Sequence, residues 1–162
     1  MKLLVSLLGW LIITAVSYVV MSSKPFNPWL FFLNLSFNWV AISFLFAYSS
    51  GWSQLAKQYR TRQSPPNNLS SMTSGRVGWV SFQGCLNIGV TAKGLYLSVF
   101  PLFCLGHPPL LIPWTAVSSV ERTKFLFQEG YRLHIGSPLI TKMHLPQDAL
   151  TDAVQVLEQK CY

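Results

Sequence analysis

The feature that most constrains the fold is an apolar run at residues 29–48, set in a stretch (25–56) that contains no charged residue. A second apolar run, residues 3–21, precedes it. A helix rises about 1.5 Å per residue, so each run is long enough to cross the ~30 Å of hydrocarbon in a bilayer. Pro25 and Pro28 between the runs discourage one continuous helix. The sequence therefore predicts two transmembrane helices joined as a hairpin.

The first run also has features of a secretory signal peptide, because Lys2 gives it a short positive start. No convincing small-residue cleavage site follows. The nearest is Thr-Ala-Val-Ser at residues 14–17, and apolar residues continue to Met21. We therefore expect a retained helix, with a cleaved signal as the alternative.

Charge predicts the orientation in the membrane. The net charge is +7, and the first 120 residues contain no Asp or Glu. Three basic residues follow the second apolar run, whereas the turn between the runs contains Lys24 alone. Because basic residues stay on the cytoplasmic side, both termini are expected in the cytoplasm. The basic residues form no dense cluster with interleaved aromatics, so we expect no nucleic-acid partner.

Residues typical of helix–helix contacts lie within the second run, and residues typical of membrane interfaces lie at or beyond its ends. Asn34 and Asn38 lie one helical turn apart, and this face is expected to pack on the first helix or to mediate self-association with another copy. Aromatic and basic side chains are expected at the two membrane interfaces, namely Trp29, Tyr48, Trp52, Lys57 and Arg60.

After residue 50 the pattern changes. Residues 51–76 are expected to form a juxtamembrane segment, made of an amphipathic helix at 51–60 and a linker rich in Ser, Asn and Pro. The apolar face of this helix either lies on the membrane surface or packs on the domain that follows. The third segment, residues 77–162, is expected to be a small β-domain.

Seven apolar, mostly alternating segments fall in this β-domain, followed by a helical stripe at 147–160. The expected strands are 77–82, 86–91, 95–100, 110–112, 117–124, 131–135 and 139–145. Six or seven strands and a final helix predict an α+β fold in which an antiparallel barrel or curved sheet is closed by the C-terminal helix.

This order, with IPWTAV at 112–117 after a strand, resembles the pleckstrin-homology-like (PH-like) fold, including its bacterial and GRAM-type relatives. It resembles more closely a family of uncharacterised bacterial membrane-anchored proteins, through GWSQLAKQYR (51–60), GLYLSV (94–99) and GHPPLLIPW (106–114). This resemblance covers roughly 51–125. It implies a PH-like domain at a bacterial inner membrane and brings no known reaction. Its relatives have an arginine at the position of Cys104, so an anion site built on that arginine would be absent here.

One loop is a candidate for binding a ligand or partner. Gly106, His107, Pro108 and Pro109 join two expected strands near Trp114, and the two prolines stiffen the loop. The alternative is that the loop only sets the crossing of the strands. A basic face for lipid headgroups or an acidic peptide, or else an ordinary solvated surface, is expected from Arg122, Lys124, Arg132 and Lys142.

Catalytic signatures are lacking in the sequence. The three histidines have no acidic residue at metal-ligand spacing, and no serine-hydrolase motif occurs, so we expect no enzyme, metal or cofactor. The prediction is a non-catalytic docking or scaffolding module whose partners are membrane lipids and another membrane or cytoplasmic protein, bound by strand addition. The alternatives are a domain that senses anionic lipid, or an accessory subunit of a membrane enzyme or transporter.

Overall fold

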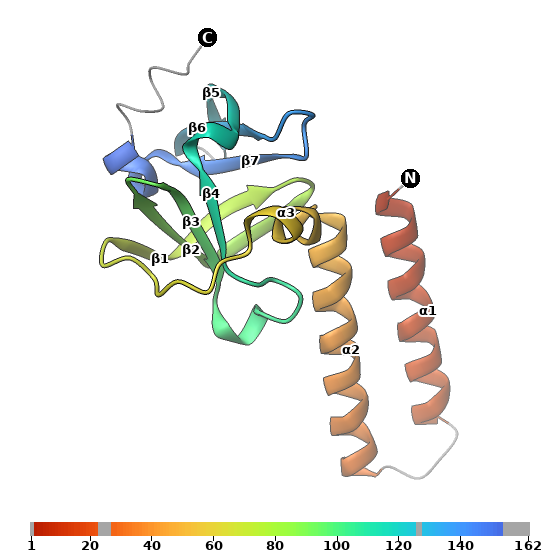
Figure 1. Cartoon of the computed structure of the whole chain (residues 1–162). Coiled ribbons are helices and arrows are strands. Elements are labelled where there is room, and N and C mark those ends of the chain that lie inside the picture. Colours follow the sequence, from red (N-terminus) through yellow and green to blue (C-terminus); the bar gives the residue numbers. More distant parts are fainter. Residues whose placement is uncertain (1, 23–26, 126–127, 154–162) are drawn as a thin grey trace.

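The computed structural model describes residues 2–22, 27–125 and 128–153 (Figure 1). Three helices come first: α1 (Lys2–Ser22), α2 (Pro28–Ser49) and α3 (Trp52–Tyr59). Seven strands follow: β1 (Leu69–Val77), β2 (Val80–Thr91), β3 (Gly94–Val99), β4 (Leu110–Pro113), β5 (Val117–Phe125), β6 (Gln128–Ile135) and β7 (Thr141–Pro146). Three 3₁₀ helices complete the described chain: η1 (Pro101–Phe103), η2 (Trp114–Ala116) and η3 (Gln147–Ala153).

The start of α2 is specified locally. Asn27 caps it, since its Oδ1 accepts a hydrogen bond from the backbone N–H of Trp29 at 3.0 Å, and Pro28 occupies the first helical position. Among the described residues, α2 is the one helix that is long and apolar enough to cross a membrane by length and composition. Its large side chains are mostly exposed; Phe37, for example, is 65% exposed.

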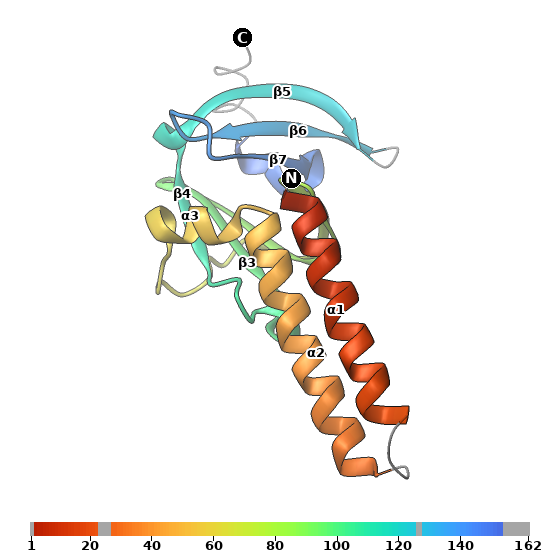
Figure 2. The ribbon, with the colours of Figure 1, turned by 90° about the vertical axis from the view of Figure 1, so that its right-hand side faces the viewer.

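The first two helices lie side by side (Figures 1 and 2). The Nδ2 of Asn38 donates to the Oγ of Ser17 on α1 at 2.9 Å, and also to the Oδ1 of Asn34 at 2.9 Å. Of the two contacts expected for the asparagine face, the structure therefore contains the one with the first helix.

Replacing Asn38 with leucine is expected to weaken the α1–α2 contact only slightly, by about 0.5–1.5 kcal/mol, because the net contribution of one hydrogen bond to stability is small. The free energy of unfolding in detergent micelles measures this loss. A loss of several kcal/mol would show that the amide does more than join the two helices.

The strands form one antiparallel sheet in the order β4-β3-β2-β1-β7-β6-β5. The sheet curls into an open half-barrel, so that β5, β6 and β7 lie over the other strands (Figure 2). Side chains alternate between the core and the outer face, as in any strand. One inward row crosses four neighbouring strands, because Val77 pairs with Met143, Met143 with Leu133 and Leu133 with Val120.

Two short helices cover the core of the half-barrel. Trp52 and Leu55 of α3 are fully buried in it, so of the two surfaces expected for its apolar face, the membrane or the β-domain, these residues pack on the β-domain. η3 contacts β2, β6 and β7 and buries Leu150. The expected C-terminal helix at 147–160 is a 3₁₀ helix as far as Ala153, and its remainder lies outside the described residues.

The structure corrects two expected boundaries. The expected linker contains most of β1, which begins at Leu69, and the expected strand 77–82 is interrupted by a two-residue turn between Val77 and Val80. Gly78 opens this turn with a φ of 57°, a conformation that favours glycine. β1 is rich in Ser, Thr and Gly, so its sequence lacks the apolar alternation that marks the other strands.

Candidate functional site

A pocket of about 450 Å³ lies where α2 ends against the sheet. One wall is the turn from α2 to α3, residues 49–51, and the other is the outer face of the sheet with the β1–β2 turn. Arg76, Arg132, Lys142 and His144 line it, and no Asp or Glu is among its described lining residues. We call it the junction pocket.

The junction pocket is held in shape by hydrogen bonds to backbone carbonyl oxygens. The Oγ1 of Thr141 donates to the carbonyl oxygen of Ser50 at 3.3 Å, and the N–H of Gly78 donates to the carbonyl oxygen of Lys142 at 2.8 Å. A Cβ at Gly78 would collide with the carbonyl oxygen of Ser50. The end of α2 is therefore seated directly on β7 and on the β1–β2 turn.

Arg76, His144 and Arg132 meet because they share one cross-strand row. Arg76 on β1 pairs with His144 on β7, His144 with Arg132 on β6, and Arg132 with Glu121 on β5. Directly opposed residues on neighbouring strands point to the same face. The sheet register thus gathers side chains that lie far apart in the sequence.

Hydrogen bonds order this row. The Nε of Arg132 donates to the Nε2 of His144 at 3.0 Å, and its Nη1 bonds the Oε2 of Glu121 at 3.0 Å. Because Nε2 accepts, His144 is neutral. Burial, followed by the positive charges of Arg132 and Arg76, lowers the pKa of His144. The charges that line the pocket are those of Arg76, Lys142 and Arg132, the last partly balanced by Glu121.

Such an arrangement is suited to holding an anion. A guanidinium group donates hydrogen bonds in a fork that matches the oxygens of phosphate or carboxylate, and an ammonium group adds a mobile charge. Among the described residues, no cluster of three or more His, Cys, Asp or Glu could hold a metal ion.

The loop expected to bind a ligand is anchored to the core. His107 is 3% exposed and packs edge-on against Trp52 and Phe82, with ring centroids 5.3 and 5.5 Å away. Its Nδ1 lies 3.1 Å from the carbonyl oxygen of Leu105, and Trp52 Nε1 donates to the carbonyl oxygen of Pro108 at 3.0 Å. These contacts favour the alternative in which the loop sets the strand crossing.

Trp114, the other expected member of that site, is half-buried elsewhere on the sheet. Its Nε1 donates to the carbonyl oxygen of Thr91 at 3.0 Å, which ties η2 to the end of β2.

The five expected interface residues divide into two groups. Trp29 and Tyr48 are 83% and 58% exposed on α2, and Lys57 and Arg60 are exposed at α3 and its end. Trp52 was also expected at the membrane interface, but it is fully buried in the core of the β-domain. Trp52 is the first residue of α3, which lies against the sheet, so its ring packs on the apolar side chains of the core.

The expected basic face also divides. Arg132 and Lys142 line the junction pocket, whereas Arg122 and Lys124 line a separate hollow, where Lys124 Nζ lies 3.8 Å from Glu129 Oε1. Sequence reasoning missed Arg76 and His144. Lys142 and His144 alternate along β7 and so share one face, which could have identified His144 from the sequence. Arg76 gave no such signal, because it lies within the expected linker.

No protein-family model, curated protein or solved structure matches this chain.

The free energy of unfolding is expected to fall as the pH drops below about 6.5. Burial lowers the pKa of both His107 and His144 in the folded protein. The unfolded chain then binds protons first, so acid favours unfolding. Urea denaturation at a series of pH values measures the slope. The variants H107N and H144N should each flatten it, and an unchanged slope in both would contradict this assignment.

Proposed function

We propose that this chain is an integral membrane protein whose non-catalytic, PH-like β-domain binds the phosphate of an anionic lipid headgroup at the cytoplasmic face of a bacterial inner membrane. The observation that carries the proposal is the basic junction pocket at the end of α2. In this view α1 and α2 form the transmembrane hairpin and both termini are cytoplasmic.

The surface of α2 supports the membrane part of the proposal. The helix contains no charged residue and exposes large apolar side chains along its length, among them Leu33 (67%) and Phe37 (65%). Exposing apolar surface to water costs about 25 cal/mol per Å², and contact with lipid tails removes this cost.

The position of the junction pocket at the end of α2 supports the binding of a lipid headgroup. Ser49 ends α2 and also lines the pocket, so an α2 that spans the bilayer puts the pocket at the level of the headgroups. Trp79, on the β1–β2 turn, lines the pocket and is 78% exposed, and tryptophan favours that interfacial level. Exposed Lys57 and Arg60 add attraction of about 1 kcal/mol each to an anionic surface.

The test compares the full chain in nanodiscs of phosphatidylcholine alone and of phosphatidylcholine with phosphatidylglycerol. A ligand that binds the folded state raises the unfolding midpoint. We expect wild type to be more stable in the anionic discs, and the double variant R76Q/K142Q to lose most of that gain. R122Q/K124Q removes the same charge from the same sheet outside the pocket and should keep the gain.

Equal loss in both double variants would mean that only the overall charge of the domain matters, and would contradict a headgroup site. The absence of any gain for wild type in the anionic discs would contradict it as well. High salt should reduce the gain, because ions screen exposed charges.

A second candidate is docking of a protein by strand addition, as expected from the open sheet. β5 is an edge strand, whereas the other edge, β4, is short and is bridged by Arg60 at Leu110. Hydrogen exchange tests this use of β5. Protection of β5 amides in native membranes but not in purified protein supports it, and equal exchange in both counts against it.

A further inference from the structure

We infer that residues 100–105, the loop that carries η1 between β3 and β4, insert into the hydrocarbon of the bilayer beside α2. The inference rests on the proposed membrane span of α2. The partner of this surface is the acyl chains of the leaflet on which the β-domain sits. The domain would then hold the membrane through its own loop as well as through its helices.

The η1 loop, residues 100–105, has the composition of a buried segment but is exposed. Its sequence is FPLFCL, and residues 94–120 around it contain no Lys, Arg, Asp or Glu. Its exposed fractions are 41% for Phe100, 61% for Leu102, 37% for Phe103 and 41% for Leu105. Exposed apolar patches of this kind mark surfaces that contact a partner or a membrane.

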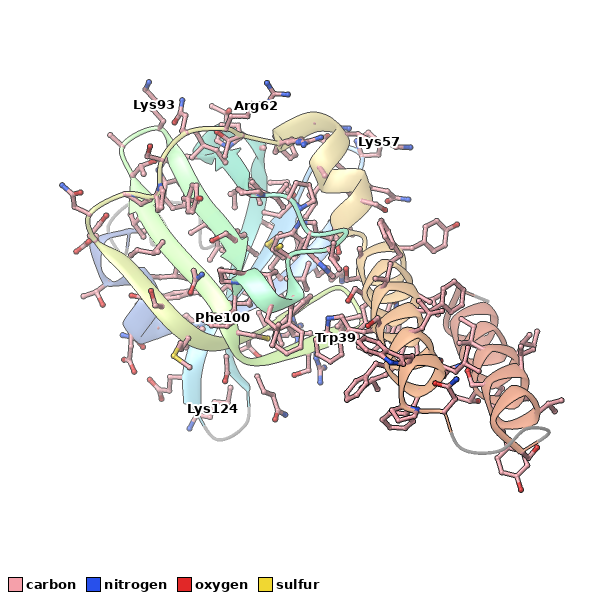
Figure 3. All side chains as sticks on the ribbon, turned by 90° about the horizontal axis from the view of Figure 1, so that it is seen from below. Trp39, Lys57, Arg62, Lys93, Phe100 and Lys124 are labelled. Carbon is pink, nitrogen blue, oxygen red and sulfur yellow. The ribbon has the colours of Figure 1, made fainter. Side chains whose placement is uncertain are left out.

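The loop follows α2 toward the middle of the helix. Its Phe103 ring lies 5.0 Å from the ring of Trp39, whose Nε1 donates to the carbonyl oxygen of Leu102 at 3.3 Å. Figure 3 shows Trp39 on the side of α2 that faces the segment carrying Phe100. Closer to the end of α2, a Cβ at Gly106 would lie 3.1 Å from the Cβ of Ala47.

The length of α2 gives the depth that the η1 loop reaches in the bilayer. Residues 40–49 separate Trp39 from the end of α2. At a rise of about 1.5 Å per residue, the η1 loop reaches about 15 Å below that end. If the end of α2 lies among the headgroups, the loop lies below them, where its exposed side chains continue the lipid-facing surface of the helix.

The backbone of the loop is suited to an environment without water, where an unpaired polar group is costly. Its N–H groups at Phe103 and Cys104 donate within the loop to the carbonyl oxygens of Phe100 and Pro101. The Cys104 carbonyl oxygen accepts from His107 N, and that of Leu105 lies 3.1 Å from His107 Nδ1. Pro101 has no N–H to satisfy. Because the loop also lies against the apolar helix α2, at Trp39, we favour lipid over a protein partner.

Cys104, an exposed free thiol in the loop, allows a direct test. In the full chain with Cys85 and Cys161 replaced by alanine, Cys104 is labelled with a fluorophore. The protein is reconstituted in vesicles of phosphatidylcholine and phosphatidylglycerol that carry chain-linked nitroxide quenchers. Two control variants, built on that background with C104A, place the single label at F37C on α2 or at S118C, exposed on β5.

We expect strong quenching at positions 37 and 104 and little at 118. Quenching at 37 without quenching at 104 would overturn the insertion of the loop and leave the membrane span intact. An absence of quenching at 37 would refute the span itself, and the insertion with it. In unlabelled protein of the same background, Cys104 is free to oxidise; disulfide-linked dimers there, together with no lipid quenching of the labelled protein, would overturn the inference in favour of contact between copies.

Discussion

Replacing Trp52 with alanine is expected to lower the free energy of unfolding of the β-domain by about 3–5 kcal/mol. The indole is fully buried, contacts the Phe82 ring at 5.8 Å between centroids, and holds the loop at Pro108 through its Nε1. Its removal leaves a cavity and an unpaired carbonyl oxygen. Urea denaturation of the full chain in detergent micelles, followed by far-ultraviolet circular dichroism, measures the loss.

The matched control is W79A. Trp79 is 78% exposed at the β1–β2 turn, so the same change there should alter the free energy of unfolding by less than about 0.5 kcal/mol. Similar losses in the two variants would contradict the placement of α3 in the core.

The second large effect is expected for G78A. A Cβ at this position would collide with the carbonyl oxygen of Ser50, which is backbone and cannot rotate away. The positive φ of 57° adds strain for any residue with a side chain. We expect a loss of about 2–4 kcal/mol in the same denaturation assay, because the helix end must move away from the sheet.

G84A separates the two causes. Gly84 has a similar φ of 64°, but its Cβ would meet nothing nearer than the Met72 carbonyl oxygen at 3.9 Å. This variant should therefore lose only about 1 kcal/mol. If G78A and G84A lose equal amounts, the contact between the β1–β2 turn and Ser50 does not constrain the fold.

Local patterns predicted the parts of the fold that depend on local physics. The uncharged run at 29–48 corresponds closely to α2, Pro28–Ser49, because length and apolarity define such a helix. The spacing of Trp52 and Leu55 predicted the amphipathic α3 but left its partner open, since a membrane surface and a protein core attract the same apolar face.

The junction pocket could not be predicted in this way, because it depends on long-range register. Arg76, Arg132 and His144 become neighbours only once β1, β7 and β6 pair. β1 itself was missed, since its Ser- and Gly-rich sequence has the composition of a linker. The candidate loop at His107 illustrates the reverse case. Two prolines predicted a stiff loop, but not that the imidazole packs inward against Trp52.

The junction pocket and the η1 loop are both arranged along α2. α2 ends at a turn seated on the sheet, the sheet register brings basic side chains to that turn, and the η1 loop follows α2 toward the middle of the helix. Recognition of a charged headgroup and insertion into the lipid tails would then act on the same leaflet.

Binding of a headgroup in the junction pocket can be measured by native mass spectrometry of the full chain, released from nanodiscs of mixed phosphatidylglycerol and phosphatidylcholine. We expect wild type and R122Q/K124Q to retain a phosphatidylglycerol molecule in preference to phosphatidylcholine, and R76Q/K142Q not to do so. Retention of both lipids in equal proportion by all three proteins would contradict a headgroup site in the junction pocket.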